Sequence, residues 1–259
     1  MLNTRFVKMM KDFARYIFLQ WFKWKHNDTK VIASYFVDSI TGFYSQAGQD
    51  AFIYSEFFSL LESGQLPKLF VDIGCNHPVK FSNSYFFETK LGFKVIAVDP
   101  LPTYISQWAS MRPNSILHTV ALGSNKGTLT LSTPAENSDT ETISHSSDMF
   151  ATLSSKNPRL LVGEWRTINV PVMTAQDLFE ANNISEVGIV SIDVEGYEME
   201  VLKGIDFKKT KISIAIIENN TNSRFGADDI RFFMDKNGFD FYARIWGLDD
   251  VFVRKDLNF

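Results

Sequence analysis

The segment FVDIGCNHPVKFSNSYFFE, residues 70–88, has the pattern of a short buried strand, a tight loop and the start of a helix. Asp72 stands near the end of the predicted strand, and Gly74 follows it. Nucleotide-binding α/β proteins hold their ligand at junctions of this kind, beyond the carboxyl end of a strand. A pyrophosphate-binding loop would need further glycines, whereas here Pro78 even removes a backbone donor. Neither a dinucleotide fingerprint nor a phosphate-binding P-loop is therefore expected.

Strand and helix patterns alternate on both sides of this segment. Strands are expected at 68–74, 93–100, 115–123, 187–192 and 211–220, with an exposed strand at 127–133 and further strands at the C-terminus. Helices are expected at 29–40, 47–62, 82–92 (capped by Ser82 and ended by Gly92), 196–203 and 226–237. This order predicts an α/β fold, a doubly wound and mostly parallel sheet with helices on both faces. The domain is expected to span residues 41–259.

Acidic side chains follow four of the predicted strands: Asp72, Asp99, Asp193 and Glu218. The carboxyl ends of parallel strands meet at one edge of a sheet, so these carboxyl groups are expected near one ligand site. S-adenosylmethionine suits such a site because it carries no phosphate. One glycine lets the backbone approach its methionine part, and Asp99 can accept both ribose hydroxyls. A ribose-binding acid would serve a dinucleotide equally well, and the missing glycines favour S-adenosylmethionine.

Four sequence segments support this interpretation. SQAGQD (45–50), FVDIGCNHPVKFSNSYFF (70–87), VIAVDPLPTY (95–104) and IVSIDVEGYEMEVLKG (189–204) together resemble the FkbM-type methyltransferases. The resemblance spans roughly residues 45 to 218 and implies a class I methyltransferase, Rossmann-like fold. It also implies S-adenosylmethionine as the methyl donor and O-methylation of a hydroxyl group on a sugar, polysaccharide precursor or related natural product.

Carried over by residue, the resemblance places Asp72, Gly74 and Asn76 on the methionine side of the cofactor. It places Asp99 on the ribose. The His77–Pro78 pair departs from the family pattern, in which many members have glycine or another small residue.

A sugar hydroxyl is a poor nucleophile at neutral pH, so a general base or a metal ion is expected. The candidate bases are Asp193, His77 and Glu195. Asp193 and Glu218, at neighbouring strand ends, could instead hold Mg²⁺ as hard oxygen ligands. In the alternative interpretation, Asp193 and Glu195 cap the helix that opens at Gly196, and His77 hydrogen-bonds the backbone.

Two segments lie outside the resemblance. Residues 134–166 are polar and show no period, which is typical of a variable insertion that determines substrate choice. Residues 1–40 form a predicted helical arm. Within residues 1–30 one side of the helical projection is apolar and the other is basic. The arm could pack on the domain or on a second copy of the chain, or it could lie on an anionic membrane surface.

The bulk composition restricts the partners. The net charge of −4 gives no reason to expect nucleic-acid binding, so the partner should be a small molecule or glycan acceptor. The lone Cys75 cannot form an internal disulfide, and no apolar run is long enough to cross a bilayer. We therefore expect a cytoplasmic protein, peripheral at the inner face of the membrane if the arm binds lipid.

Two other functions remain open at this level. In the first, Asp193-Val194-Glu195 supplies the metal-binding acids of a nucleotide-sugar glycosyltransferase. In the second, the chain is a non-catalytic, membrane-associated binding protein built on a methyltransferase-like scaffold.

Overall fold

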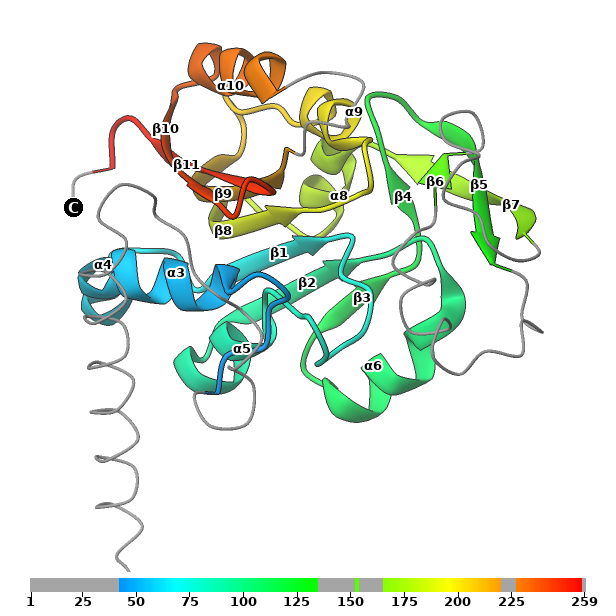
Figure 1. Ribbon diagram of the computed structural model, residues 1–259, viewed down its shortest axis with the longest axis horizontal. Coiled ribbons are helices and arrows are strands. Elements are labelled where there is room, and N and C mark those ends of the chain that lie inside the picture. The colour runs from blue at the N-terminus through cyan, green and yellow to red at the C-terminus, as the bar shows by residue number, and fades with distance from the viewer. Residues whose placement is uncertain (1–41, 135–151, 154–164, 220–226, 258–259) are drawn as a thin grey trace, which may run out of the picture.

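The computed structural model describes residues 42–134, 152–153, 165–219 and 227–257 (Figure 1). The predicted arm, its helix at 29–40 and most of the insertion at 134–166 lie outside the described residues. Within the described part of the chain, no helix combines the length and the apolar character that crossing a membrane requires.

A seven-stranded sheet forms the centre of the fold (Figure 1). Its order is β10-β11-β9-β8-β1-β2-β3, and the five strands from β9 to β3 are parallel. The strands are β1 (Leu69–Ile73), β2 (Lys94–Val98), β3 (Ile116–His118), β8 (Glu186–Ile192), β9 (Lys211–Glu218), β10 (Phe239–Ile245) and β11 (Asp249–Arg254). The chain runs outward from β1 to β3 and then returns to β8, so the strand order switches between β1 and β8. The prediction of a doubly wound, mostly parallel sheet is confirmed.

Helices cover both faces of this sheet. One layer holds α3 (Gln49–Glu56), α4 (Phe58–Ser63), α5 (Tyr85–Leu91) and α6 (Ile105–Met111), and the other holds α8 (Ala175–Ala181), α9 (Glu198–Lys203) and α10 (Ala227–Lys236). A short 3₁₀ turn, η1 (Pro102–Tyr104), precedes α6. Successive strand residues point to opposite faces. Phe70 accordingly packs with the α3–α6 layer and Val71 with the other.

The same alternation places the first of the strand-end acids. Asp72 lies on the face of Phe70, beside Ser191 of β8 and Ala97 of β2 in the strand register. The buried strand interiors on both sides of it are apolar, so the polar groups concentrate where the strands end.

A second, four-stranded sheet stands beside the carboxyl edge of the first, with the order β4-β7-β5-β6. It contains β4 (Ala121–Leu122), β5 (Gly127–Pro134), β6 (Thr152–Leu153) and β7 (Trp165–Met173). The prediction of one strand at 115–123 is therefore wrong: β3 stays in the main sheet, while β4 pairs with β7. The strand predicted as exposed at 127–133 buries Leu131 against Ala121 and Val170.

Two helix boundaries also differ from expectation. The helix predicted at 47–62 is interrupted at Phe57, whose ring is buried and whose φ of −110° separates α3 from α4. Helix α5 begins after Ser84 and not at Ser82, although Ser82 Oγ accepts a hydrogen bond from the Tyr85 N–H at 3.2 Å. The expected end at Gly92 is confirmed, with φ of +69°.

Candidate functional site

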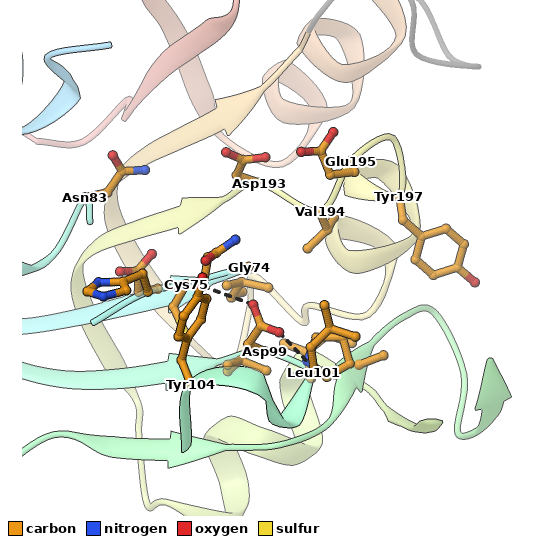
Figure 2. A pocket seen from close by; sticks show the side chains of 18 of the residues that line it. Gly74, Cys75, Asn83, Asp99, Leu101, Tyr104, Asp193, Val194, Glu195 and Tyr197 are labelled. Carbon is orange, nitrogen blue, oxygen red and sulfur yellow. Dashed lines mark hydrogen bonds between the residues drawn. The ribbon is translucent and has the colours of Figure 1, made fainter. Parts of the chain in front are cut away.

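A cavity of about 240 Å³ opens at the carboxyl ends of β1, β2 and β8. Its walls are the loop after β1, the segment after β2, residues 193–197 and apolar side chains of β4 and β5 (Figure 2). All the predicted site residues except Glu218 line it: Asp72, Gly74, Asn76, His77, Asp99, Asp193 and Glu195. The topology thus brings together residues that are far apart in the sequence.

Gly74 is required by the packing of β1 against β8. It has a φ of +82°, and a Cβ atom added to it would lie 1.7 Å from the carbonyl oxygen of Asp193. The Asp193 N–H donates to the Ile73 carbonyl at 3.0 Å, which fixes this close approach. The glycine therefore brings the ends of the two strands together at the floor of the cavity.

Gly74→Ala is expected to be strongly destabilising, because the new methyl group would force the Asp193 carbonyl away and strain a left-handed backbone. We expect a cost of several kcal/mol, roughly 10 °C in Tm for a domain of this size. Gly92→Ala is the matched control, since its φ is +69° but no atom lies within 4 Å of the added Cβ. Equal melting temperatures for the two variants in a thermal scan would contradict the packing argument.

Asp99 orients the loop that follows β1. Its Oδ2 accepts a hydrogen bond from the Asn76 N–H at 3.0 Å, and its Oδ1 accepts one from the Leu101 N–H at 2.9 Å (Figure 2). The Asn76 carbonyl accepts a hydrogen bond from Trp108 Nε1 at 2.7 Å, which fixes the loop from the side of α6. A carboxylate oxygen can accept more than one hydrogen bond, so a held Asp99 can also receive a diol.

His77 stabilises the same loop. Its Nδ1 accepts hydrogen bonds from the Val79 N–H at 3.0 Å and the Lys80 N–H at 2.9 Å, and its ring packs edge-on against Tyr104. A ring that accepts at Nδ1 carries its proton on Nε2. The two backbone N–H groups occupy the lone pair of Nδ1, which favours the structural interpretation of His77 over its prediction as a general base.

Asp72 connects the cavity to a buried network around Arg112. Asp72 Oδ2 accepts a hydrogen bond from Ser84 Oγ at 2.5 Å, and Ser84 Oγ accepts one from Arg112 at 3.0 Å. Arg112 also donates to the Pro78 carbonyl and pairs with Glu88. Burial raises the pKa of Asp72, opposed by the Ser84 hydrogen bond and the Arg112 charge. Asp72 thus supports the loop from below.

A cluster of carboxyl groups forms the opposite side of the site. Burial raises the pKa of Asp193 well above its ordinary value, and the nearby charges of Glu195, Asp249 and Glu198 raise it further. Burial and the charges of Glu218 and Glu198 raise the pKa of Glu195 to about 8. Burial raises the pKa of Asp249 to about 6. At neutral pH this cluster holds protons that isolated carboxylates would have released.

Glu198, the first residue of α9, holds the loop before the helix, and among the described residues no side-chain hydrogen bond caps α9, so neither Asp193 nor Glu195 has the capping role of the alternative interpretation. Its Oε1 accepts hydrogen bonds from the Val194 N–H at 3.1 Å and the Gly196 N–H at 2.9 Å, at the start of α9. Glu195 itself has a φ of +56°, a left-handed conformation that is costly for a residue with a side chain. Asp193 and Glu195 are therefore available for chemistry in the cavity.

Glu218 lies behind the cavity and not on its wall, where its side chain hydrogen-bonds those of Asp193 and Glu198. A hydrogen bond between two carboxyl groups requires a proton, which agrees with the raised pKa of Asp193. Among the described residues, no three or more His, Cys, Asp or Glu side chains are arranged to hold a metal ion. The predicted Mg²⁺ pair of Asp193 and Glu218 gains no support from this arrangement.

The raised pKa of Glu195 has a consequence for stability. The pKa of Glu195 is about 8 in the folded protein against an ordinary value of 4.5, so its ionisation costs stability as the pH rises from about 4.5 to 8. Glu195→Gln removes this cost. After discounting for partial exposure, we expect about 2 kcal/mol at pH 8.5, or about 4–8 °C in Tm, and little difference at pH 4.5. Thermal scans of both proteins from pH 4.5 to 8.5 measure the difference in Tm. A difference that did not grow with pH would contradict the raised pKa of Glu195.

Comparison of the sequence with protein-family models gives a match over most of the main sheet. The family model described as the methyltransferase FkbM domain matches residues 72–241, from the end of β1 into β10. The chain belongs to the FkbM methyltransferase family. The order and direction of the strands are those of the class I methyltransferase fold, and the cavity at the strand ends is the candidate site of this FkbM domain.

Comparison with solved structures adds one similar chain at low similarity. The structure of magnesium protoporphyrin IX methyltransferase from Synechocystis PCC 6803, determined with bound SAM, matches with a TM-score of 0.39 and 15% identity. The match covers 94% of this chain and 96% of that one. The comparison with curated protein sequences gave no significant match.

Two residues of the motif SQAGQD, which precedes the matched FkbM region, make structural contacts: Gln49 and Asp50. Asp50 is fully buried, and its carboxyl group accepts hydrogen bonds from the Tyr44 N–H and from Ser45 Oγ. Gln49 Nε2 donates to Asp249 Oδ2 at 2.9 Å, which joins α3 to β11 behind the carboxyl cluster. Sequence reasoning assigned no role to several residues that line the cavity of this FkbM domain: Gln46, Lys80, Phe81, Asn83, Tyr104, Val194 and Tyr197. Asn83 lies within the SNSYFF motif (82–87), and its place in that motif was the sequence feature that could have indicated a role in the site.

Proposed function

We propose that this chain transfers a methyl group from S-adenosylmethionine to a hydroxyl group of a sugar, polysaccharide precursor or related natural product. One observation carries the proposal. Asp99 is held by two backbone N–H groups on one side of a single cavity, and the carboxyl groups of Asp193 and Glu195 lie on the other (Figure 2). This arrangement supports a ribose-binding role for Asp99 and a proton-accepting role for Asp193 or Glu195 within one ligand-sized space.

The cavity fits this cofactor chemically. Apolar side chains beside Asp99 can receive an adenine ring: Val98, Leu101, Val120, Leu129 and Leu131. Asp99 can accept the ribose hydroxyls, and the floor at Gly74 is open backbone. The carboxyl groups of Asp72 and Asp193 suit a ligand with positive charges. The apolar and the acidic parts of the cavity match the two ends of S-adenosylmethionine.

When bound, S-adenosylmethionine supplies a methyl group on a positively charged sulfonium. The protein's part is to align the acceptor hydroxyl and to remove its proton. Asp193 and Glu195 are the proposed bases, because their carboxyl groups line the cavity and the pKa of Glu195 is raised to about 8. A base whose pKa is close to the working pH can both accept the proton and release it again.

The rival glycosyltransferase function has less support. A nucleotide-sugar diphosphate needs phosphate donors or a bound metal ion, whereas the wall at 193–195 carries carboxyl groups with raised pKa values. A carboxyl group that keeps its proton is a poor ligand for the metal ion that would neutralise the two phosphates. The rival predicts binding of UDP in the presence of Mg²⁺.

Calorimetric titration with S-adenosylhomocysteine tests the proposal, with and without Mg²⁺ and in parallel with UDP. We expect one-site binding of S-adenosylhomocysteine that does not depend on Mg²⁺. A screen of nucleotide sugars and oligosaccharides as acceptors would then follow. Binding of UDP with Mg²⁺, and none of S-adenosylhomocysteine, would replace the methyltransferase by the glycosyltransferase function.

A further inference from the structure

Asn83 brings an unsatisfied polar atom to the wall of the cavity. The residue is 9% exposed and stands just before α5. Its Nδ2 donates to Ser191 Oγ at 2.9 Å, whereas its Oδ1 has no hydrogen-bond partner among the described residues. A buried carbonyl oxygen without a partner costs about 1–3 kcal/mol, so such atoms call for an explanation. A ligand that donates to Oδ1 would remove this cost.

The position of Asn83 indicates which end of a ligand it meets. Its anchor Ser191 lies on β8, on one side of β1, whereas Asp99 follows β2 on the other side. Figure 2 shows Asn83 and Asp193 along one side of the cavity and Asp99 with Leu101 along the other. A ligand whose ribose contacts Asp99 and which crosses Gly74 therefore has its far end at Asn83.

The carboxyl groups that line the cavity with Asn83 favour a cationic donor, because a neighbouring positive charge stabilises their ionised form. The carboxyl groups of Asp72 and Asp193 line the same cavity. Lys80 is the one lysine or arginine among the described lining residues, and it is exposed. A buried carbonyl oxygen close to carboxyl groups suits an ammonium group, which has three donors and a positive charge.

We propose that Asn83 Oδ1 accepts a hydrogen bond from the α-ammonium group of the methyl donor and so fixes its amino-acid end. This assignment rests on the proposed function. Ser191 is then the group that orients the Asn83 amide, because its hydroxyl group occupies Nδ2 and leaves Oδ1 for the ligand. Asn83 would be a binding residue and would take no proton in the reaction.

The test uses two ligands that share the adenosine and the thioether. S-adenosylhomocysteine has the amino-acid end, and 5′-methylthioadenosine lacks it. Asn83→Leu is expected to weaken the binding of S-adenosylhomocysteine about 10- to 100-fold, as measured by calorimetry. This is the range for the loss of one hydrogen bond to a charged group. Its affinity for 5′-methylthioadenosine should equal that of the unchanged protein. The deaminated analogue of S-adenosylhomocysteine, which retains the carboxylate, should also bind both proteins equally.

Two further variants separate binding from a structural role. Asn83→Asp keeps an acceptor oxygen in place and should retain S-adenosylhomocysteine affinity within a few fold. Asn237→Leu is the matched control, because its amide donates to the Phe233 carbonyl at the end of α10 and should leave both affinities unchanged. Unchanged S-adenosylhomocysteine affinity in Asn83→Leu, or equal loss of both ligands, would overturn the assignment. If the unchanged protein bound neither ligand, the proposed function would fail and this assignment with it.

Discussion

Asp99→Ala is expected to weaken the binding of S-adenosylhomocysteine about 100-fold. Two effects combine in this variant. The ribose loses its charged acceptor, worth about 1.5–3 kcal/mol for a hydrogen bond to a charged group. The loop also loses the oxygens that hold the Asn76 and Leu101 N–H groups, so the cavity is less well formed before binding. Calorimetric titration measures the change directly.

Two control variants separate the loss of the Asp99 carboxylate from a general effect on folding. Asp99→Asn keeps an oxygen and the shape of the side chain, and it should fall between the alanine variant and the unchanged protein. Asp240→Ala removes an exposed carboxylate on β10, away from the cavity, and should bind as the unchanged protein does. An unchanged affinity in a folded Asp99→Ala protein would show that the ribose lies elsewhere.

Asp193→Asn is expected to lower turnover about 10²- to 10⁴-fold, the usual contribution of a general base. The affinity for S-adenosylhomocysteine should stay within a few fold, because the variant keeps the side-chain volume and the proposed cofactor contacts lie at Asp99 and Asn83. The measurement is transfer of a labelled methyl group to the acceptor found by screening, with binding followed separately by calorimetry.

The carboxyl cluster makes this prediction sharper. The charge of Glu195 raises the pKa of Asp193, whereas the pKa of Glu195 is raised by burial and by the charges of Glu218 and Glu198. Replacing Asp193 therefore leaves Glu195 as an acid with a pKa of about 8. The residual activity of Asp193→Asn should rise with pH toward about 8, as Glu195 ionises. Near-normal turnover would remove Asp193 from the catalytic residues.

Local sequence patterns determined the secondary structure and where the polar groups gather. The apolar runs at 69–73, 94–98, 186–192 and 211–218 each became a buried parallel strand, since a strand that is covered on both faces needs continuous apolar residues. The acids that end these runs then had to lie at one edge of the sheet. Three of the four predicted strand-end acids, Asp72, Asp99 and Asp193, accordingly line the cavity, and Glu218 does not.

Patterns of neighbouring residues could not predict strand pairing or hydrogen bonds that involve segments distant in the sequence. The run at 115–123 is continuously strand-like, yet Ala121 and Leu122 pair with Val172 and Met173 of β7 in another sheet. Likewise, a serine before a helix is a good cap in general, but Ser84 bonds the buried Asp72, and the helix starts after it. Which partner a residue chooses is settled by packing and not by its neighbours in sequence.

The chemistry of the site shows the same division. The presence of Asp193 and Glu195 at a strand end follows from the sequence alone, because strand and loop propensities are local. Their proton affinities do not, because burial and the charges of Glu198, Glu218 and Asp249 come from segments that meet only in the folded chain. Electrostatic interaction depends on distance and on exclusion of water, and both are properties of the tertiary structure. The sequence alone therefore predicted which acids lie at the strand ends, and only the fold decided which other residues line the cavity and which acids hold a proton.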